Sequence, residues 1–317
     1  METENSARQL QKISHYRGQH DFHTLDSNLP SPKSQPETQH PRQAPRTTIG
    51  ALDVLPLELL QEILLELDLR TLTDFRHVNR YSTELVESLY QYEAINKHAP
   101  NALRGILSIG TGRWITCRTL YENLCTQTCK ECRNFGGYLY LLTCKRVCIN
   151  CWSNRMLYLP LSPRWASYFF GLDDMVVETL PQMKVVPGIY SRTMKRLQSR
   201  SVLVDYECAR QAGIALYGSV GAMQKHAQQK RRENFSAGGK SIIDSISLGD
   251  YELDPVRFVA IVEAPWLNKS SQQVDWGFYC AGCSEFDPLL RLRRFTDSSF
   301  DRHVKFWGDI RDGKHRR

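Results

Sequence analysis

Six cysteines lie within residues 125–151, and their spacing is the pattern in this chain that points most directly to chemistry. Two C-x2-C pairs, Cys129 with Cys132 and Cys148 with Cys151, are separated by fifteen residues. Each pair forms a tight turn that directs two thiolates at one ion, and the segment between the pairs can bring them together around a tetrahedral metal. The spacing therefore predicts a structural zinc site with these four ligands.

The two remaining cysteines of this stretch, Cys125 and Cys144, are either substitute ligands or bystanders. Six cysteines cannot supply the two interleaved sites of a RING domain, so we expect no ligase chemistry within this chain. Redox or disulfide chemistry stays open as a second interpretation. Gly136–Gly137 permits a turn and Tyr138–Leu142 is a candidate strand, so residues 125–152 are predicted to form a small zinc-stabilised β-hairpin.

A second group of metal-ligand residue types lies near the C-terminus. Cys280 and Cys283 form another C-x2-C pair, and a helix capped by Asp297 would turn His303 toward them. His315 is a candidate fourth ligand. A second zinc site is one interpretation of this group, and a reduced, buried pair of thiols is the other.

The strongest helical pattern precedes both groups and covers residues 55–95. Pro56 and Glu58 are typical of the first turn of a helix. The apolar positions that follow fall on two faces, one with Leu60, Leu64 and Leu67 and the other with Leu59 and Ile63. A short helical unit can bury one face internally but is too small to bury both. We therefore expect the second face to meet another molecule.

Two short helices are expected after the first. Thr71 and Asp74 resemble a capping box for the second helix, and Asn79 is a favourable N-cap for the third. The sequence therefore predicts a three-helix unit over residues 50–96.

This unit resembles the F-box, the module that docks a protein onto the Skp adaptor of cullin-based ubiquitin ligases. An LPxE start, an ILxxL core and a later Val-Asn-Arg turn occur in that order. A helical hairpin packed into its own globular domain is the alternative. The resemblance implies that the adaptor binds through an apolar contact. The expected adaptor-binding residues are Leu55, Pro56, Leu59, Ile63, Leu67, Leu72 and Val78.

The order of the later motifs is similar to that of fungal F-box proteins with a cysteine-rich zinc-binding appendage. These motifs read GGYLYLLTCKRVC, FGLD, PGIY and LVDYE, followed by the C-terminal CxxC and FxxH. In that family the last motif ends in a further cysteine, where this chain has Lys305–Gly308. The resemblance therefore supplies no fourth ligand for the second site.

The remaining regions set the predicted organisation. Residues 1–49 are polar and contain repeated prolines, which predicts a disordered tail. Residues 97–124 are expected to be a linker. Residues 153–317 are expected to form a C-terminal mixed α/β region, with strands over Ser201–Asp205 and Val256–Glu263 and a helix over Tyr206–Tyr217. The predicted fold class is α+β.

Composition narrows the classes of function that the chain can have. It has 317 residues with a formal net charge of +7, which permits acidic partners without requiring nucleic acid. No membrane span and no signal peptide are visible, so we expect a cytoplasmic or nuclear protein. P-loop, GxSxG, HExxH and GxGxxG patterns are absent from the sequence, which favours a non-catalytic protein.

Three functions fit these patterns. The first is a substrate-recruiting subunit that binds the Skp adaptor, and through it a cullin, and also binds an unknown protein substrate. The second is a zinc-stabilised nucleic-acid or chromatin binder that uses cations at 192–200, 225–232 and 291–317. We rank nucleic-acid binding below adaptor binding because aromatic residues do not alternate with these cations. The third is an F-box-like protein that uses the adaptor outside a ligase.

Overall fold

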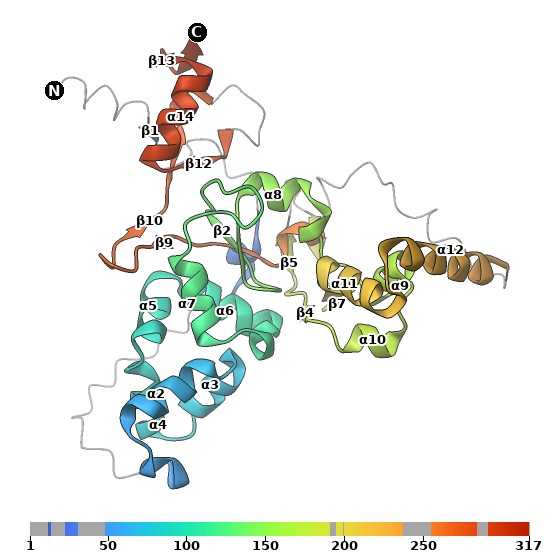
Figure 1. The fold of residues 1–317 in the computed structure, drawn as a ribbon. Coiled ribbons are helices and arrows are strands. Elements are labelled where there is room, and N and C mark those ends of the chain that lie inside the picture. Colours follow the sequence, from blue (N-terminus) through green and yellow to red (C-terminus); the bar gives the residue numbers. More distant parts are fainter. Residues whose placement is uncertain are drawn as a thin grey trace.

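The computed structural model describes residues 12–13, 23–30, 48–190, 195–198, 200–236, 255–283 and 291–316. Figure 1 shows a central group of strands and helices from which three parts extend. These parts are the N-terminal helices, a second helical lobe and a C-terminal region around α14. The described residues form a mixed α and β structure with small sheets, as the predicted α+β class requires.

The N-terminal helical unit contains the three predicted helices and continues into a fourth. Its elements are the 3-10 helix η2 (Gly50–Val54), α2 (Leu57–Glu66), α3 (Leu69–Arg76), α4 (Arg80–Glu87) and α5 (Tyr90–His98). As predicted, Asn79 caps α4, and its side chain accepts a hydrogen bond from the Ser82 N–H. The predicted capping box at Thr71 is wrong. Asp68 caps α3 instead, because its carboxylate precedes the helix and accepts from two free N–H groups.

The predicted linker over 97–124 is wrong, because this segment is helical and its apolar side chains form part of the main core. It contains α6 (Pro100–Ile109), η3 (Thr111–Trp114) and α7 (Cys117–Cys125). Ala102, Ile106 and Leu120 are fully buried. Their helical spacing places them on faces that pack against the neighbouring helices and the central sheet. The N-terminal unit and the sheet are therefore joined by a rigid helical connection.

A three-stranded antiparallel sheet lies at the centre in the order β3-β2-β8. Its strands are β2 (Tyr138–Tyr140), β3 (Lys145–Val147) and β8 (Ile261–Glu263). Leu139 pairs with Arg146 on one side and with Val262 on the other. The predicted segment 125–152 therefore contains an antiparallel β2–β3 pair, and a strand from much later in the chain completes the sheet. Only the end of the predicted strand Val256–Glu263 is extended, because residues 255–258 form the 3-10 helix η7 (Pro255–Phe258).

Part of the predicted disordered tail belongs to the core, which corrects that prediction for residues 23–30. The 3-10 helix η1 (Leu25–Asn28) buries Leu25 completely. Gly105 permits this packing, because a Cβ at Gly105 would lie 3.2 Å from Leu25 Cδ2 and 2.6 Å from Leu141 Cδ1. Nearer the N-terminus, β1 (Lys12–Ile13) pairs with β11 (Phe278–Cys280). The rest of residues 1–49 lies outside the described residues.

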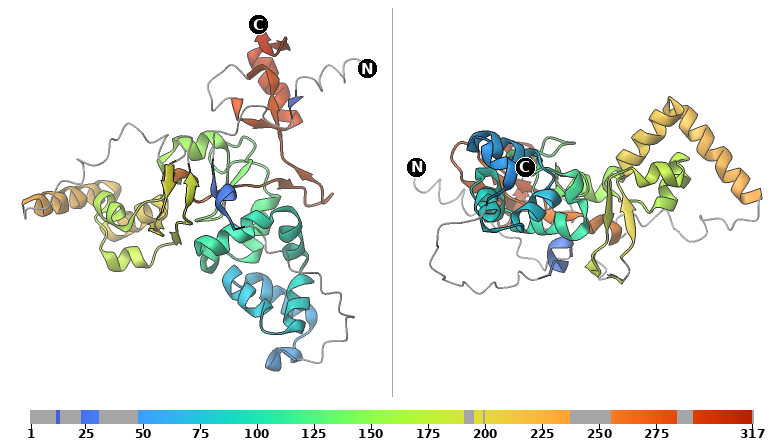
Figure 2. Two further views of the ribbon diagram at one scale, coloured as in Figure 1. Left: turned by 180° about the vertical axis from the view of Figure 1, so that it is seen from behind. Right: turned by 90° about the horizontal axis from the view of Figure 1, so that it is seen from below.

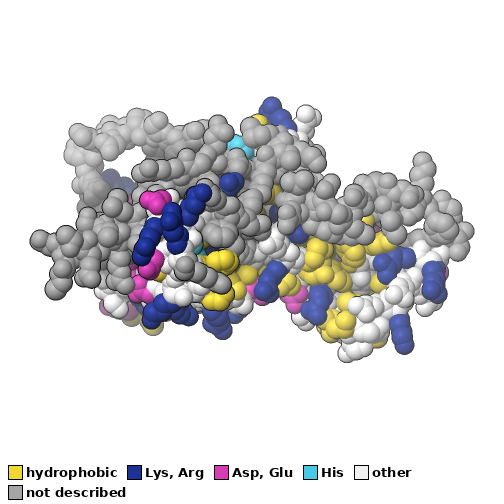
Figure 3. Space-filling view, turned by 90° about the horizontal axis from the view of Figure 1, so that it is seen from above, with side chains coloured by type: hydrophobic (Ala, Val, Ile, Leu, Met, Phe, Trp, Pro, Cys, Tyr) yellow, Lys and Arg dark blue, Asp and Glu magenta, His cyan; other side chains and the backbone are white. Residues whose placement is uncertain are grey.

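A second core forms a separate helical lobe. Figure 2 shows α12 projecting from this lobe away from the centre, and Figure 3 shows hydrophobic side chains gathered on its side of the molecule. The predicted helix and the predicted strand SVLVD are confirmed as α11 and β7. The elements from the sheet to the end of the lobe are α8 (Ile149–Asn154), η4 (Met156–Tyr158), α9 (Pro163–Phe170), α10 (Asp174–Glu178), β4 (Gln182–Lys184), β5 (Gly188–Tyr190), β6 (Lys195–Leu197), β7 (Val202–Val204), α11 (Tyr206–Tyr217) and α12 (Val220–Ser236).

The C-terminal region returns past the sheet and ends in a small unit around α14, with its own apolar cluster. Its elements are β9 (Trp266–Leu267), β10 (Val274–Asp275), β11 (Phe278–Cys280), η8 (Ala281–Cys283), β12 (Arg294–Phe295), α14 (Asp297–Trp307), β13 (Asp309–Arg311) and β14 (Lys314–Arg316). Within the described residues, no helix is long and apolar enough to cross a bilayer.

Candidate functional site

The four predicted cysteines of the first group converge. The sulfur atoms of Cys129, Cys132, Cys148 and Cys151 all lie within 4.8 Å of one another. The Sγ atoms of Cys132 and Cys148 are 3.5 Å apart. Four thiols at these separations surround a single point, so this group could hold a metal ion. We call it the first metal centre.

Backbone hydrogen bonds build the first metal centre from two chain segments. The first knuckle closes through the Arg133 N–H, which donates to the Cys129 carbonyl at 3.1 Å, and Arg133 has a left-handed backbone with φ 62°. The Lys130 N–H donates to the Arg146 carbonyl at 2.9 Å and so ties this knuckle to β3. Cys148 is the N-cap of α8, which places Cys151 in its first turn. A helix N-terminus favours negative charge, so this position suits thiolates.

Further contacts stabilise negative charge on the sulfur atoms. The Asn134 amide donates to Cys132 Sγ at 3.2 Å. Hydrogen bonds from the thiols of Cys148 and Cys151 hold the pKa of Cys129 well below its usual range. The same contact with Cys129 raises the pKa of the Cys148 thiol, so Cys148 keeps its own proton. A cation at the centre would favour removal of the remaining protons.

The two further cysteines of the stretch do not belong to the first metal centre. Cys125 and Cys144 fall outside the convergent group, so the expectation that they could be ligands is wrong. Burial raises the pKa of the Cys144 thiol to about 12, and burial also raises the pKa of Cys125. Cys144 is therefore a small buried thiol, and Cys125 is a half-buried one.

Arg146 locks the segments around the first metal centre together. Its guanidinium is buried and donates to backbone carbonyls from three separate parts of the chain. The acceptors are the carbonyls of Asn123, Leu124, Gly136, Ala264 and Pro265. The glycine at 136 is required for this packing rather than for a turn, because a Cβ there would lie 2.5 Å from Arg146 Cγ. No local pattern in the sequence indicates this role, because the carbonyl acceptors lie in segments distant from Arg146.

The second group also converges, with His315 as its fourth member. Cys283 Sγ lies 3.4 Å from His303 Nε2 and 3.5 Å from His315 Nε2. Cys280 Sγ lies 3.3 Å from His315 Nε2. A hydrogen bond from the Cys283 thiol lowers the pKa of Cys280 to about 4. This group could also hold a metal ion, and we call it the second metal centre.

The histidines of the second metal centre are oriented as ligands. The Nε2 atoms of His303 and His315 face each other at 3.1 Å. His315 Nδ1 lies 2.9 Å from the Gly308 carbonyl, to which it can only donate. A neutral His315 therefore turns the Nε2 lone pair inward, as in many metal sites where a carbonyl fixes the tautomer. Two inward nitrogens at this distance require a proton or a cation between them.

The position of His315 depends on a hairpin that the sequence signals. β13 pairs with β14 through an Asp312–Gly313 turn, in which both residues have positive φ. A D-G pair between strands is a strong hairpin signal, and it could have assigned His315 from sequence. Gly282 permits the close approach, since a Cβ there would lie 2.9 Å from His315 Nε2.

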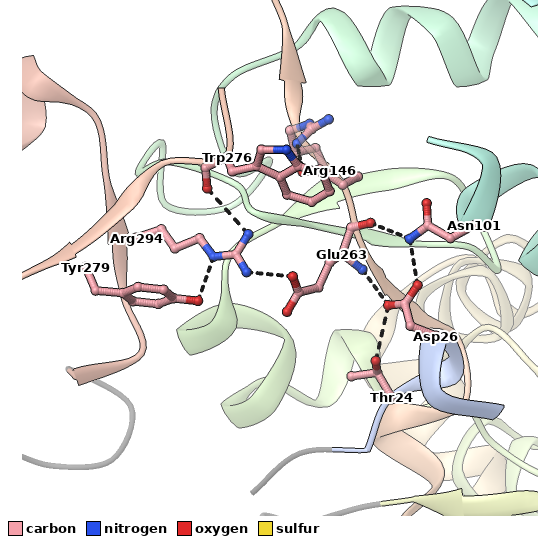
Figure 4. A network of polar contacts seen from close by, with 9 residues as sticks. Thr24, Asp26, Asn101, Arg146, Glu263, Trp276, Tyr279 and Arg294 are labelled. Atoms are coloured by element: carbon pink, nitrogen blue, oxygen red, sulfur yellow. Dashed lines mark hydrogen bonds and ion pairs between the residues drawn. The ribbon is translucent and has the colours of Figure 1, made fainter. Parts of the chain in front are cut away.

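A polar network joins the second metal centre's region to the main core (Figure 4). The Arg294 guanidinium donates to Glu263 on β8 at 2.7 Å and to the Tyr279 hydroxyl at 3.0 Å. The Glu263 N–H donates to Asp26 in η1 at 2.8 Å, and the Asn101 amide donates to the same carboxylate at 2.6 Å. Burial raises the pKa of Asp26 despite these donors.

The leucine-rich helix α2 has the two faces that its pattern predicts. Leu60 and Leu64 are 3% and 1% exposed, whereas Leu59 and Ile63 are 54% and 44% exposed. Val54, Leu57 and Val78 extend the exposed set. Leu59 and Ile63 lie four residues apart on one side of α2, and we call them the apolar face.

Not every residue expected to bind an adaptor lies on the apolar face. Leu72 is fully buried in the core, so the expectation that it binds a partner directly is wrong. It points inward because α3 packs against α4 and η3. Leu55 and Leu67 are half-buried and lie at the two ends of α2, while Pro56 is exposed.

No family model, curated protein or solved structure matches the chain.

Proposed function

We propose that this protein is a substrate-recruiting F-box subunit of a cullin-type ubiquitin ligase. It docks on the Skp adaptor through the apolar face and reaches the cullin through that adaptor. It holds an unknown protein substrate through the rest of the chain and performs no transfer chemistry itself. It acts in the cytoplasm or nucleus and contains structural zinc.

The observation that carries the adaptor proposal is the unused side of α2. Leu59 and Ile63 are 54% and 44% exposed on the side of α2 that the core does not cover. Val54, Leu57 and Val78, which are 49% to 84% exposed, add further apolar surface to the helical unit. Leaving such side chains in water is unfavourable by roughly 25 cal/mol per Å² of apolar surface. A partner groove that covers them removes that cost, as in other helix-in-groove contacts. The F-box resemblance, which rests on the order of its motifs, also assigns adaptor contacts to this helix.

The donor separations support zinc as the metal. Thiolates at about 2.3 Å from a tetrahedral zinc lie about 3.8 Å from each other, and imidazole nitrogens at about 2.0 Å lie about 3.3 Å apart. The S–S separation of 3.5 Å at the first centre and the N–N separation of 3.1 Å at the second agree with these values. A set of four cysteines, or of two cysteines and two histidines, with no open position is typical of structural zinc. Each ion would join segments that are distant in the chain.

The adaptor proposal is tested by capture of a purified recombinant Skp adaptor. Leu59→Glu combined with Ile63→Glu places two carboxylates in the apolar contact, and we expect binding to fall at least about a hundredfold, since each buried charge is costly. Both side chains are exposed, so the fold and metal content stay unchanged. Retained capture by this double variant would refute the proposal.

Leu216→Glu is the matched control, because Leu216 is 52% exposed but lies on α11, away from the apolar face. It should bind the adaptor normally. A cullin in the captured complex separates a ligase subunit from a protein that uses the adaptor only as a stability partner.

Nucleic-acid binding remains the alternative function. Two cations of α12 already have internal partners: Lys230 Nζ lies 2.6 Å from Asp173 Oδ1, and Arg231 lies over the Tyr168 ring. Because these cations already interact within the lobe, α12 is a poorer surface for binding nucleic acid. Steeply salt-dependent binding of duplex DNA or RNA by the purified chain would favour the alternative.

A further inference from the structure

A small open cavity lies where the N-terminal helices meet the β4–β7 pair. Its volume is about 150 Å³. Polar and apolar residues both line it, and the charged residues among them are Arg70, Arg113 and Lys184. None of the eight residues that line it is acidic. Neither the metal centres nor the apolar face uses this cavity.

Close packing of two segments brings Arg70 and Arg113 to the same margin. Gly110 ends α6 with a left-handed backbone, and the chain turns at once into η3. Gly112 then lets η3 approach α3, because a Cβ at Gly112 would lie 3.2 Å from the Arg70 nitrogen. Lys184 comes from the opposite side, on β4, which contacts α6. The cations therefore come from three separate segments.

The local charge stays positive after the nearby negative groups are counted. Asp74 Oδ2 lies 3.9 Å from Arg70 Nε, but the two side chains are 76% and 72% exposed, so this pair is weak. The carboxyl end of α6 adds a partial charge of about −0.5. Asp68 is also close, because its carboxylate accepts a hydrogen bond from the Arg70 N–H at 3.1 Å. Solvent weakens the effect of these exposed carboxylates, so the three cations leave the pocket a small positive excess.

We propose that this pocket binds a phosphomonoester group, such as that of a phosphorylated serine or threonine. A phosphomonoester carries about −1.5 to −2 charges at neutral pH and has three strong acceptor oxygens, so it can engage three cations better than a single carboxylate does. Guanidinium groups bind phosphate oxygens through paired N–H donors, and two arginines with a lysine are a typical set for this purpose. This site goes beyond adaptor docking and does not depend on it.

Methyl NMR of the full-length, metal-loaded chain tests the proposal with a local probe. Met183 lines the cavity and is buried, whereas Met175 is 76% exposed on α10. With ¹³C-methyl methionine, N-acetyl phosphoserine amide should shift the Met183 signal in a saturable way and leave Met175 unchanged. The Met183 signal is assigned with Met183→Leu. The proposal would be overturned if the Met183 shift does not saturate, or saturates only with a Kd above about 10 mM.

Variants identify the cations responsible. Arg113→Gln combined with Lys184→Gln should weaken phosphoserine binding about tenfold or more, since each charged hydrogen bond contributes strongly. Both side chains are exposed, so metal content should not change. The matched control, Lys225→Gln with Lys269→Gln, removes two exposed cations elsewhere and should bind normally. Equal weakening by both pairs would show general electrostatic attraction and overturn the site.

Further probes distinguish the source of the phosphate group. N-acetyl glutamate amide should bind at least about fivefold more weakly than phosphoserine, because it carries less charge. Equal binding of the two would overturn phosphate selectivity. Inorganic phosphate that binds as tightly as phosphoserine would support the site and assign it to free phosphate. Phosphoserine that binds more tightly would assign it to a modified side chain. Adaptor capture by the same variants should stay normal.

Discussion

The two metal centres use the same kind of C-x2-C pair but differ in what they hold together. The first centre lies at the edge of the central sheet, with Cys129 fully buried and Cys151 3% exposed. The second lies in the C-terminal unit, where His315 is half-buried on a terminal hairpin. One set of ligands is contiguous with the main core, and the other closes a small unit with its own apolar cluster.

This difference teaches that similar ligands can have unequal structural consequences. Metal at the first centre would restrain the knuckle that supports β3 and α8, and both elements pack into the main core. Metal at the second would restrain α14 and the β13–β14 hairpin. The preceding segment is tied to the core by hydrogen bonds from Arg294 to Glu263 and from Arg293 to Asn134. We therefore expect global consequences from the first centre and local consequences from the second.

The largest effect is expected from Cys148→Ala. It removes a ligand of the first centre, and metal-coupled folding free energy is about 10 kcal/mol or more at structural zinc sites. That equals or exceeds the typical stability of a domain, about 5–15 kcal/mol, so the main core should unfold. Urea unfolding followed by tryptophan fluorescence measures this. Cys144→Ala removes a buried thiol outside the centre and should cost far less. Equal unfolding midpoints would break the comparison.

Arg146→Met should have the next largest effect, about 3–5 kcal/mol in free energy of unfolding. The methionine fills much of the space but leaves buried carbonyls from three segments without their donor. Arg133→Met removes an exposed cation from the same knuckle and should cost less than about 0.5 kcal/mol. If both variants unfold at the same urea concentration, Arg146 does not lock the first centre in place.

His315→Gln should separate the two centres most clearly. We expect elemental analysis to fall from two zinc ions per chain to one. Increased hydrogen exchange should be confined to α14 and the terminal hairpin, and the melting temperature of the main core should change by less than about 4 °C. Lys314→Gln on the same hairpin should change neither quantity. Faster exchange throughout the central sheet would show that the second centre also supports the main core.

The smallest effect concerns the junction between the two regions, at Asp26. Burial raises its pKa in the folded protein above the unfolded value of about 3.9. The folded state therefore holds this proton more tightly, so the contribution of Asp26 to stability is fully present below about pH 4 and is lost as the pH rises through the folded pKa.

Asp26→Asn isolates this contribution. The difference in free energy of unfolding between the wild type and Asp26→Asn, measured in urea at several pH values, should shift against the wild type as the pH rises from about 4. Taking the difference cancels the loss of metal that acid causes in both proteins. A difference that is independent of pH would show that Asp26 does not titrate with an altered pKa.

Local patterns were sufficient for much of the candidate site. The C-x2-C spacing identified all four residues of the first centre, because ligands in two short knuckles need only a hairpin between them. The exposure of Leu59 and Ile63 followed from helical periodicity alone, since two apolar faces cannot both be buried by so short a unit. Tyr206–Tyr217 was predicted to the residue, and the structure shows that Asp205 caps this helix and Gly218 ends it.

Other features could not be read locally. Leu72 belongs to the same apolar pattern as Leu59, and only the packing of α3 decides that it points inward. The buried position of Leu25 depends on space beside Gly105, and polar flanking residues hide it in the sequence. The segment over 97–124 was read as a linker because its helices are short and interrupted by glycine and proline. Its tertiary partners stabilise it instead.

The sequence by itself determined which residues carry ligand and contact chemistry: the cysteine pairs, His303 and the apolar side of α2. Only the tertiary structure decided how these residues are joined. Strand β8 completes the sheet of the β2–β3 hairpin, and residues 23–30 pack into the same core, although both segments are distant from the hairpin in sequence. The pocket with Arg70, Arg113 and Lys184 is also a product of tertiary structure, since its cations lie in three separate segments. The physical reason is the sequence separation of the contacts. Periodicity and spacing report only neighbours within a turn or a hairpin, whereas burial and the clustering of charges depend on contacts between distant segments.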